Sequence, residues 1–361
     1  MLIVLLVIIG LALLILAHEA GHFFVAKAFK LKIDEFGFGF PPKIFGRKRG
    51  ETEYSLNWLP LGGFVRIAGE NDRLTGNLDK FDSYSEAEKK RIFLFQPSWK
   101  RSLVILAGVT VNFLLGWLII SFIFMRGIPS ALIISNVQKD SPAAAAGLMT
   151  GDVVTNYFSA TETYKEAEEG KRVPAFIEFV NNNRGKEITV EVSRDGEKLS
   201  FTAVPRLAPG PNEGALGVEL GEAGVEAVGF FEALSRGFKQ TLLIAWMTLI
   251  AFGQLVKNLV TQGALLEGVV GPVGIFAVAE QTGRIALIYL LQLMAAISIN
   301  LAVINLIPFP ALDGGRFFMI LVEKLKGSPI SRRAEALLNG LGFAFLIVLI
   351  VLITIRDVSR F

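Results

Sequence analysis

The sequence predicts a polytopic α-helical membrane protein with four transmembrane helices, a β-hairpin region after the first span and an α+β domain outside the membrane. Of the 361 residues, 52% are hydrophobic, and the mean hydropathy of +0.52 is too high for an ordinary soluble protein. Several apolar runs approach the roughly 20 residues that cross about 30 Å of hydrocarbon. The predicted spans lie near residues 1–27, 102–125, 285–307 and 338–355.

Basic residues in the connecting segments predict which side of the membrane each segment faces. Lysine and arginine are dense after the first span, before the second span, and after the third span between residues 316 and 333. The positive-inside rule places such segments in the cytoplasm. We therefore expect a multi-pass protein of the cytoplasmic (inner) membrane, with residues 127–237 on the extracytoplasmic side.

A fifth apolar stretch, "TLLIAWMTLIAFGQLV" from Thr241 to Val256, is short for a span at 16 residues. If it crossed the membrane, the next span would run from inside to outside, and the basic residues 316–333 would face outward. We therefore expect this stretch to lie along the outer interface or to pack against the bundle without crossing.

The segments between the spans divide the chain into four regions. Residues 30–101 alternate in polarity and turn on Gly and Pro, which predicts short strands with hairpin turns. Residues 128–206 combine strand-like and short helical stretches. The expected regions are a first membrane half at 1–127, a folded extracytoplasmic domain at 128–206, a linker with an interfacial helix at 207–284, and a second membrane half at 285–361.

The first span contains "HEAGH", which matches the H-E-x-x-H pattern of zinc proteases. His18 and His22 are four residues apart, so they share a helix face and can bind one metal ion. Ionisable groups inside a span are costly, which makes these residues a functional-site hypothesis. We expect them to hold Zn²⁺ with an open position for water, and Glu19 to act as the general base.

The third metal ligand should be a carboxylate, because the chain has no cysteine and no other histidine. The acidic residues near predicted spans are Asp34, Glu35, Glu267, Glu280 and Asp313. Asp313 is favoured because prolines end the third span just before it and Gly314 and Gly315 permit an unusual backbone path beside it. The first and third spans also run in the same direction, which puts their candidate ligands at similar depth. A carboxylate of the cytoplasmic loop, such as Glu35 or Glu51, stays an alternative.

"HEAGH" in the first span, together with "NLIPFPALDGG" from Asn305 to Gly315, closely resembles the site-2 protease family, in particular the bacterial RIP metalloproteases of the RseP type. "LPLGGFVRIAGE" and "GPVGI" extend the likeness over most of the chain. The resemblance implies that His18, His22 and Asp313 bind zinc and that Glu19 is the catalytic base. It further implies that Asn305 helps to hold the substrate or its developing oxyanion.

The resemblance also implies a function. It is zinc-dependent cleavage of transmembrane segments of other proteins, such as anti-sigma factors already trimmed by another protease or remnant signal peptides. The resemblance further implies that the strands after the first span form a membrane-associated β-hairpin that contacts substrate, through Gly62, Gly63 and Phe64. The physical reason is that an extended peptide gains main-chain hydrogen bonds at a sheet edge. Ordinary turn glycines would give the same sequence pattern, and that reading stays open.

Residues 128–206 resemble a PDZ domain, through "DSPAAAAGLMTGDVV" and "GKEITVEVSRDG". Only one such domain fits the available length, whereas many relatives of the RseP type carry two. The alternative function is a catalytically silent PDZ membrane scaffold. The intact set of four candidate site residues, His18, Glu19, His22 and Asp313, argues against it. A nucleic-acid partner is not expected, because the net charge is only +3 and the basic residues form no patch.

Overall fold

The computed structural model describes residues 2–70, 84–161, 171–194, 197–210, 213–262, 270–285 and 287–360. The chain forms two compact units. The membrane unit comprises Met1–Ser121, Leu234–Gly283 and Tyr289–Phe361, and the sheet unit comprises Phe122–Ala233 and Arg284–Ile288.

Five helices of the described residues are long and apolar enough to cross a membrane. Four of them cover the predicted spans: α1 (Leu2–Ala28), α4 (Ser98–Arg126), α9 (Leu287–Leu306) and α11 (Arg332–Arg360). The fifth, α7 (Phe230–Gln262), has 33 residues and contains the 16-residue apolar stretch, which alone is short for a span. Apolar length alone therefore allows one crossing more than the four expected.

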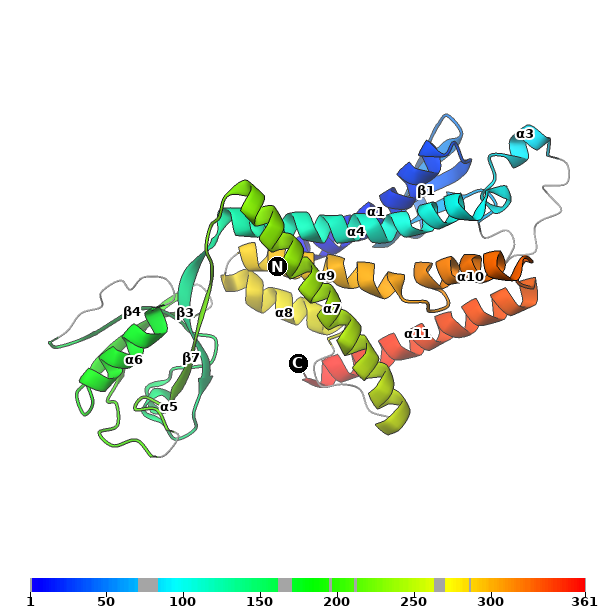
Figure 1. Cartoon of the computed structure of the whole chain (residues 1–361). Coiled ribbons are helices and arrows are strands. Elements are labelled where there is room, and N and C mark those ends of the chain that lie inside the picture. Colours follow the sequence, from blue (N-terminus) through cyan, green and yellow to red (C-terminus); the bar gives the residue numbers. More distant parts are fainter. Residues whose placement is uncertain are drawn as a thin grey trace. The chain divides into compact units, whose positions relative to one another are not determined.

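Helix α7 packs against two other helices of the membrane unit (Figure 1). Trp117 Nε1 on α4 donates to the carbonyl oxygen of Leu234, at 3.0 Å. Thr248 Oγ1 donates to Asn300 Oδ1 on α9, at 2.6 Å. Both side chains are half-buried, and their hydrogen bonds link α7 to α4 and α9.

Two shorter helices complete the part of the membrane unit that positions the site. Helix α8 (Pro272–Ile285) precedes α9, and α10 (Asp313–Lys326) follows it after a sharp turn (Figure 1). The connection from the β-hairpin to α4 contains one helical turn, α3 (Glu86–Lys89), and the 3₁₀ turn η2 (Phe93–Phe95). Residues 71–83 of this connection lie outside the described residues.

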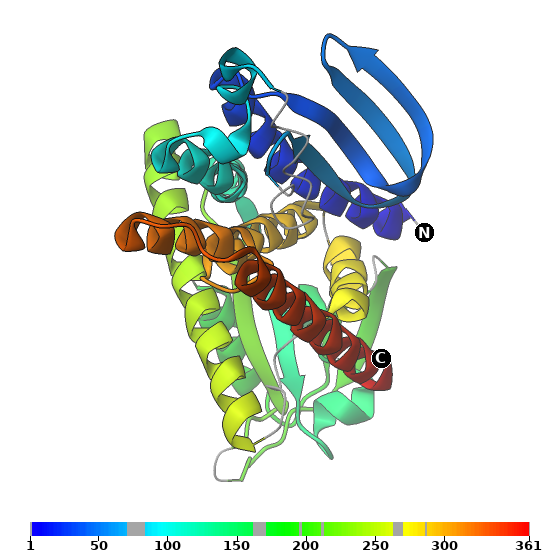
Figure 2. The ribbon, with the colours of Figure 1, turned by 90° about the vertical axis from the view of Figure 1, so that its right-hand side faces the viewer.

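The hairpin after α1 consists of two long antiparallel strands, β1 (Ile33–Arg49) and β2 (Thr52–Ile67), which extend beside α1 (Figure 2). Phe36 pairs with both Val65 and Tyr54, so each long strand contains two paired runs. This pairing agrees with the short strands and hairpin turns that the sequence predicts. A core that includes Phe23, Ile33 and Ile67 ties the base of the hairpin to α1.

The sheet unit is an α+β fold with a five-stranded antiparallel sheet in the order β6-β5-β4-β3-β7. Its elements are β3 (Ile128–Val137), α5 (Pro142–Ala146), β4 (Val153–Ser159), α6 (Arg172–Asn182), β5 (Ile188–Arg194), β6 (Glu197–Ala203) and β7 (Val218–Val225). Helix α6 packs Phe176 and Phe179 against the sheet. The fold continues past the expected boundary at residue 206, because β7 pairs with β3 from Val218 to Val225.

Candidate metal centre

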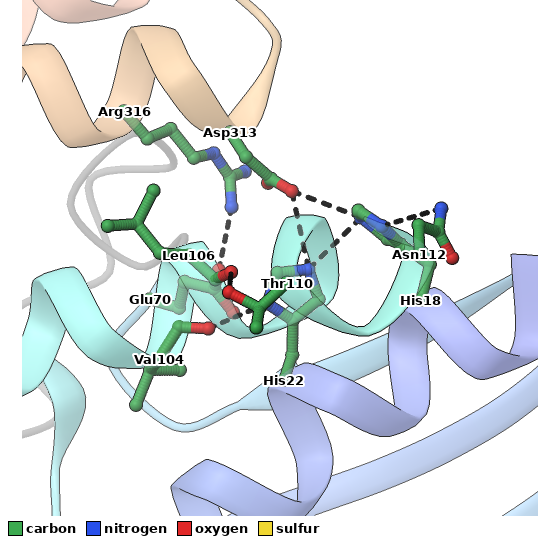
Figure 3. A network of polar contacts seen from close by, with 9 residues as sticks. All are labelled: His18, His22, Glu70, Val104, Leu106, Thr110, Asn112, Asp313 and Arg316. Atoms are coloured by element: carbon green, nitrogen blue, oxygen red, sulfur yellow. Dashed lines mark hydrogen bonds and ion pairs between the residues drawn. The ribbon is translucent and has the colours of Figure 1, made fainter. Parts of the chain in front are cut away.

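Helix α1 and the start of α10 bring two imidazoles and one carboxylate together (Figure 3). His18 Nε2 lies 3.0 Å from Asp313 Oδ2, and His22 Nε2 lies 3.4 Å from the same oxygen. The possible ligand atoms of the three residues all lie within 4.8 Å of one another. The fold therefore brings together His18 and Asp313, which are 295 positions apart in the sequence.

Asp313 reaches this position because α10 begins very close to the end of α9. A Cβ on Gly314 would overlap the carbonyl oxygens of Leu306 and Ile307, and one on Gly315 would overlap that of Phe309. Only glycine permits so close an approach of two backbones. Burial would raise the pKa of Asp313, but hydrogen bonds to His18 and His22 hold that pKa below its usual value. Asp313 therefore stays the carboxylate that a metal ligand must be.

Helix α4 packs behind the two histidines. A Cβ on Gly21 of α1 would come 2.6 Å from the carbonyl oxygen of Ala107, and one on Gly108 would come 2.8 Å from His18 Nε2. His22 Nδ1 lies 2.8 Å from the carbonyl oxygen of Val104, and Asn112 Nδ2 lies 3.3 Å from His18 Nδ1. Sequence reasoning missed these partners, although a polar Asn within an apolar span was a usable signal.

A cavity of about 210 Å³ opens beside the three residues. Besides His18, His22 and Asp313, its walls are formed by Glu19, Phe64, Val65, Glu70 and Arg316. The first span therefore contributes Glu19 next to the candidate ligands, and the hairpin contributes part of the wall. A water molecule therefore has room to approach the cluster.

Of the four residues expected to contact substrate, two lie at the cavity and two lie away from it. Phe64 lines the cavity, and a Cβ on Gly63 would lie 3.4 Å from Glu19 Cγ. Gly62 lies instead beside the ring of Phe40, on the hairpin itself. Asn305 is near the end of α9 and is not among the residues that line this cavity.

Glu70 and Arg316 form an ion pair across the cavity wall, with Arg316 Nη1 2.7 Å from Glu70 Oε1 (Figure 3). Glu70 follows the hairpin, and Arg316 lies on the first turn of α10, three residues after Asp313. The pair therefore ties the hairpin end to the segment that carries Asp313. Burial raises the pKa of Glu70, although the Arg316 charge opposes that shift.

The other candidate carboxylates lie apart from the histidines. Among the described residues, His18, His22 and Asp313 form the one cluster of three potential ligands. Glu35 accepts from Ser55 Oγ and pairs with Arg66 within the hairpin. Asp34 lies 3.7 Å from Lys32, and Glu51 pairs with Arg91. Glu267 lies outside the described residues.

The donor set fits zinc. Two imidazole nitrogens and one carboxylate oxygen make the three-ligand arrangement typical of catalytic zinc sites, in which the fourth position is left for water. The cavity beside the cluster provides space for that fourth position. A purely structural zinc site would instead be closed by four protein ligands.

Comparisons with known proteins agree with this chemistry. A family model described as peptidase family M50 matches residues 6–349. The "Regulator of sigma-W protease RasP" of Bacillus subtilis is 28% identical, over 96% of this chain and 96% of that protein. A putative zinc metalloprotease of Clostridium perfringens is 33% identical over 97% of each chain. Another, of Brucella suis, is 31% identical over 92% of this chain and 89% of that protein.

Proposed function

Because the chain belongs to peptidase family M50, the site-2 proteases, we propose that His18, His22 and Asp313 hold its catalytic zinc and that Glu19 is its general base. The chain is a multi-pass membrane protein and a zinc-dependent intramembrane metalloprotease of regulated intramembrane proteolysis. The observation that carries the residue roles is the convergence of the three candidate ligands within 4.8 Å.

The residues around the cavity supply the parts of a peptide hydrolysis. When bound, zinc lowers the pKa of a water molecule and polarises the scissile carbonyl group. Glu19 follows His18 directly and lines the same cavity, so its carboxylate can take a proton from the attacking water and return it to the leaving amine. Glu70 holds the Arg316 guanidinium at the cavity wall through an ion pair.

Substrate should enter as an extended segment along the hairpin. Phe64 and Val65 of β2 form part of the cavity wall, and Gly63 leaves room beside Glu19. An extended peptide that paired with this strand would bring its main chain past the candidate ligands. Gly62 would then act through the backbone beside Phe40. A role for Asn305 requires the substrate to reach past the cavity to the end of α9.

The proposed substrates are transmembrane segments of other membrane proteins, such as trimmed anti-sigma factors or remnant signal peptides. The name of the Bacillus subtilis relative refers to a sigma-factor regulator. A catalytically silent scaffold is disfavoured, because the family is one of peptidases. The four proposed site residues also line one cavity, which supports an enzyme.

We further propose four spans, with α7 packed against the bundle and not crossing it. The turn before α10 lies next to α11 through a hydrogen bond from the Ala311 amide to Asn339. The start of α8 lies next to Asp357 on the same helix, through the Gly274 amide. These two positions on α11 are 18 residues apart (357 − 339), about 27 Å at 1.5 Å per residue. Helix α8 therefore starts about one membrane thickness away from Asp313.

The end of α4 and the start of α7 lie together at Trp117 and Leu234. If α7 and α8 both start on the extracytoplasmic side, α7 makes no net crossing. The sheet unit would then be an extracytoplasmic PDZ domain that restricts which substrates reach the site. The strand pairing of a five-stranded sheet covered by α6 supports the PDZ assignment.

Reconstitution tests the proposed activity. The purified protein in liposomes, loaded with one equivalent of zinc, should cut a single-pass substrate with a short ectodomain within its membrane segment. A chelator should stop cleavage and added zinc should restore it. Intact substrate at full zinc occupancy, with several sequences tried, would contradict the proposal.

Cysteine labelling tests the topology, because the chain has no native cysteine. Cysteines placed at the exposed positions Arg49 and Ser328 should both be protected from an impermeant reagent added outside, while one at Lys198 should react. Opposite behaviour of positions 49 and 328 would show an odd number of crossings between them and overturn the four-span arrangement.

A further inference from the structure

One face of α4 lies behind both histidines of the candidate metal centre. Val104, Gly108 and Asn112 are spaced by four residues, so they share that face. Gly108 leaves no room for a side chain between α4 and the imidazoles. The carbonyl oxygen of Val104 and the side-chain amide of Asn112 therefore reach the imidazole nitrogens that point away from Asp313 (Figure 3).

The contact to His22 admits one arrangement of the proton. A backbone carbonyl can only accept a hydrogen bond, so His22 Nδ1, at 2.8 Å from the oxygen of Val104, carries the proton. In the neutral imidazole, Nε2 then has the lone pair that binds a metal. Val104 thus fixes the metal-binding tautomer of His22 without using a side chain.

The contact to His18 admits two arrangements, because a side-chain amide has both a donor and an acceptor end. Asn112 is 1% exposed, and its Nδ2 faces His18 Nδ1 at 3.3 Å. In this orientation Nδ1 accepts and His18 Nε2 carries the proton, which it can donate to Asp313 Oδ2 at 3.0 Å. The Asn112 Oδ1 is buried and has no hydrogen-bond partner among the described residues.

Zinc requires the opposite tautomer. A metal ion at Nε2 takes the lone pair of that nitrogen, so the proton must move to Nδ1. A half-turn of the Asn112 amide exchanges its two ends and places Oδ1 where Nδ2 now lies. The oxygen then accepts from Nδ1–H, and the buried acceptor without a partner is satisfied.

We propose that Asn112 is a positioning residue for the metal centre: its Oδ1 accepts from His18 Nδ1–H in the zinc-bound protein and so holds His18 in the tautomer that binds the metal through Nε2. The inference rests on the zinc ligands proposed above and adds the residue that orients one of them. The backbone of Asn112 is fixed by α9. Ser298 Oγ, which is fully buried, donates to the backbone carbonyl oxygen of Asn112 at 2.8 Å.

The two histidines of the chain allow a direct spectroscopic test. In zinc-loaded protein labelled with ¹⁵N-histidine, both Nδ1 atoms should be protonated and both Nε2 atoms should show metal-bound shifts. A protonated Nε2 on one imidazole, with its Nδ1 bound to zinc or accepting a hydrogen bond, would overturn the role of Asn112. An imidazole with neither nitrogen shifted by zinc would overturn the ligand set instead, so the two failures are distinguishable.

Variants of the full-length protein give a second, independent readout. Asn112→Leu removes the acceptor at similar volume and should weaken zinc binding, measured by chelator competition, by about 10- to 100-fold, as is typical for partners that orient metal ligands. Asn112→Asp keeps an acceptor and should recover most of that loss. If the Leu variant fails to fold, the wild-type ¹⁵N spectrum and the Asp variant still decide the question.

Thr110→Val is the matched control on α4. Its hydroxyl donates to the carbonyl oxygen of Leu106, one turn earlier on the same helix, at 2.8 Å. It should leave zinc affinity unchanged. Equal zinc affinities for the Leu variant, the control and the wild type would overturn the proposal, as would a loss in the Asp variant as large as that in the Leu variant.

Discussion

Each of the two units buries a carboxylate against nitrogen-bearing side chains, and only one of the two arrangements is open. In the sheet unit, Arg194 Nε and Nη2 donate to both oxygens of Asp152, at 2.7 and 2.8 Å, and the Met149 amide adds a third bond. In the membrane unit, Asp313 meets two imidazoles at 3.0 and 3.4 Å, beside a cavity of about 210 Å³.

The difference lies in what the partners can still do. A guanidinium has donors and no lone pair to offer, so the Asp152 pair is complete in itself and serves stability. Imidazoles have lone pairs that bind metal, so the Asp313 cluster can exchange its mutual hydrogen bonds for a metal ion. A buried charge cluster thus becomes a chemical site where its members are ligands and space remains beside them.

The largest expected effect comes from Glu19→Gln. This substitution keeps the shape of the side chain and all three candidate ligands but removes the proton acceptor. Cleavage of a transmembrane substrate should fall by about 10²–10⁴-fold, while zinc content stays at the wild-type level. Turnover close to that of the wild type would show that Glu19 is not the general base of the candidate metal centre.

Asp313→Ala should lower both zinc occupancy and cleavage, because two histidines alone leave the site one ligand short. Elemental analysis of the purified protein measures the occupancy. Asp34→Ala is the control, since Asp34 lies 3.7 Å from Lys32, outside the cluster. Full zinc occupancy in the Asp313 variant would show that Asp313 is not a zinc ligand, and the contrast drawn with Asp152 would then fail.

Asp152→Ala should have the opposite profile. Removing one partner of a buried ion pair typically costs about 3–5 kcal/mol, so the sheet unit should unfold at lower temperature or be cut by proteases. Zinc content of the membrane unit should not change. A loss of zinc in this variant would show that the sheet unit contributes to the metal centre.

The smallest effect is expected from Glu70→Gln, which keeps a hydrogen-bond acceptor for Arg316. Because burial raises the pKa of Glu70 above 4.5, the native state binds this proton more tightly than the unfolded state. The stabilisation from this group is therefore full below about pH 4.5 and declines as the pH rises through the native pKa. The Gln variant should lack that decline when unfolding is measured across the pH range, and an unchanged pH dependence would contradict the assignment.

The sequence allowed the histidine pair and Glu19 to be predicted because their spacing is local to one helix. Asp313 could be inferred because few carboxylates lie near the spans and glycines follow it. Val104, Asn112 and Glu70 could not be found in the same way. Each contacts a residue of a different element, and the pattern of apolar and polar residues along a chain does not reveal such contacts. The position of β7 escaped prediction for the same reason, because its partner β3 lies far back in the chain.

Helix length was the other source of error. The apolar stretch at 241–256 covers only part of α7, which continues at both ends through polar residues such as Arg236, Lys239 and Lys257. Hydropathy measures the apolar part of a helix, whereas hydrogen bonding along the backbone sets its ends. The hairpin follows its sequence more closely, since Phe36 pairs with both Val65 and Tyr54, as expected for short runs joined by turns.

Helix α4 contacts both helices that carry the candidate ligands, α1 and α10, while supplying no ligand itself. It meets α1 through Val104 and Asn112, and it meets α10 through a largely buried ion pair between Arg101 and Glu323, at 3.1 Å. Helix α4 thus fixes the positions of α1 and α10 relative to each other. One extra residue inserted between Arg101 and Asn112 would turn one set of contacts by about 100° relative to the other. Such a chain would keep every letter of its metal-binding motifs and still lose its catalytic geometry.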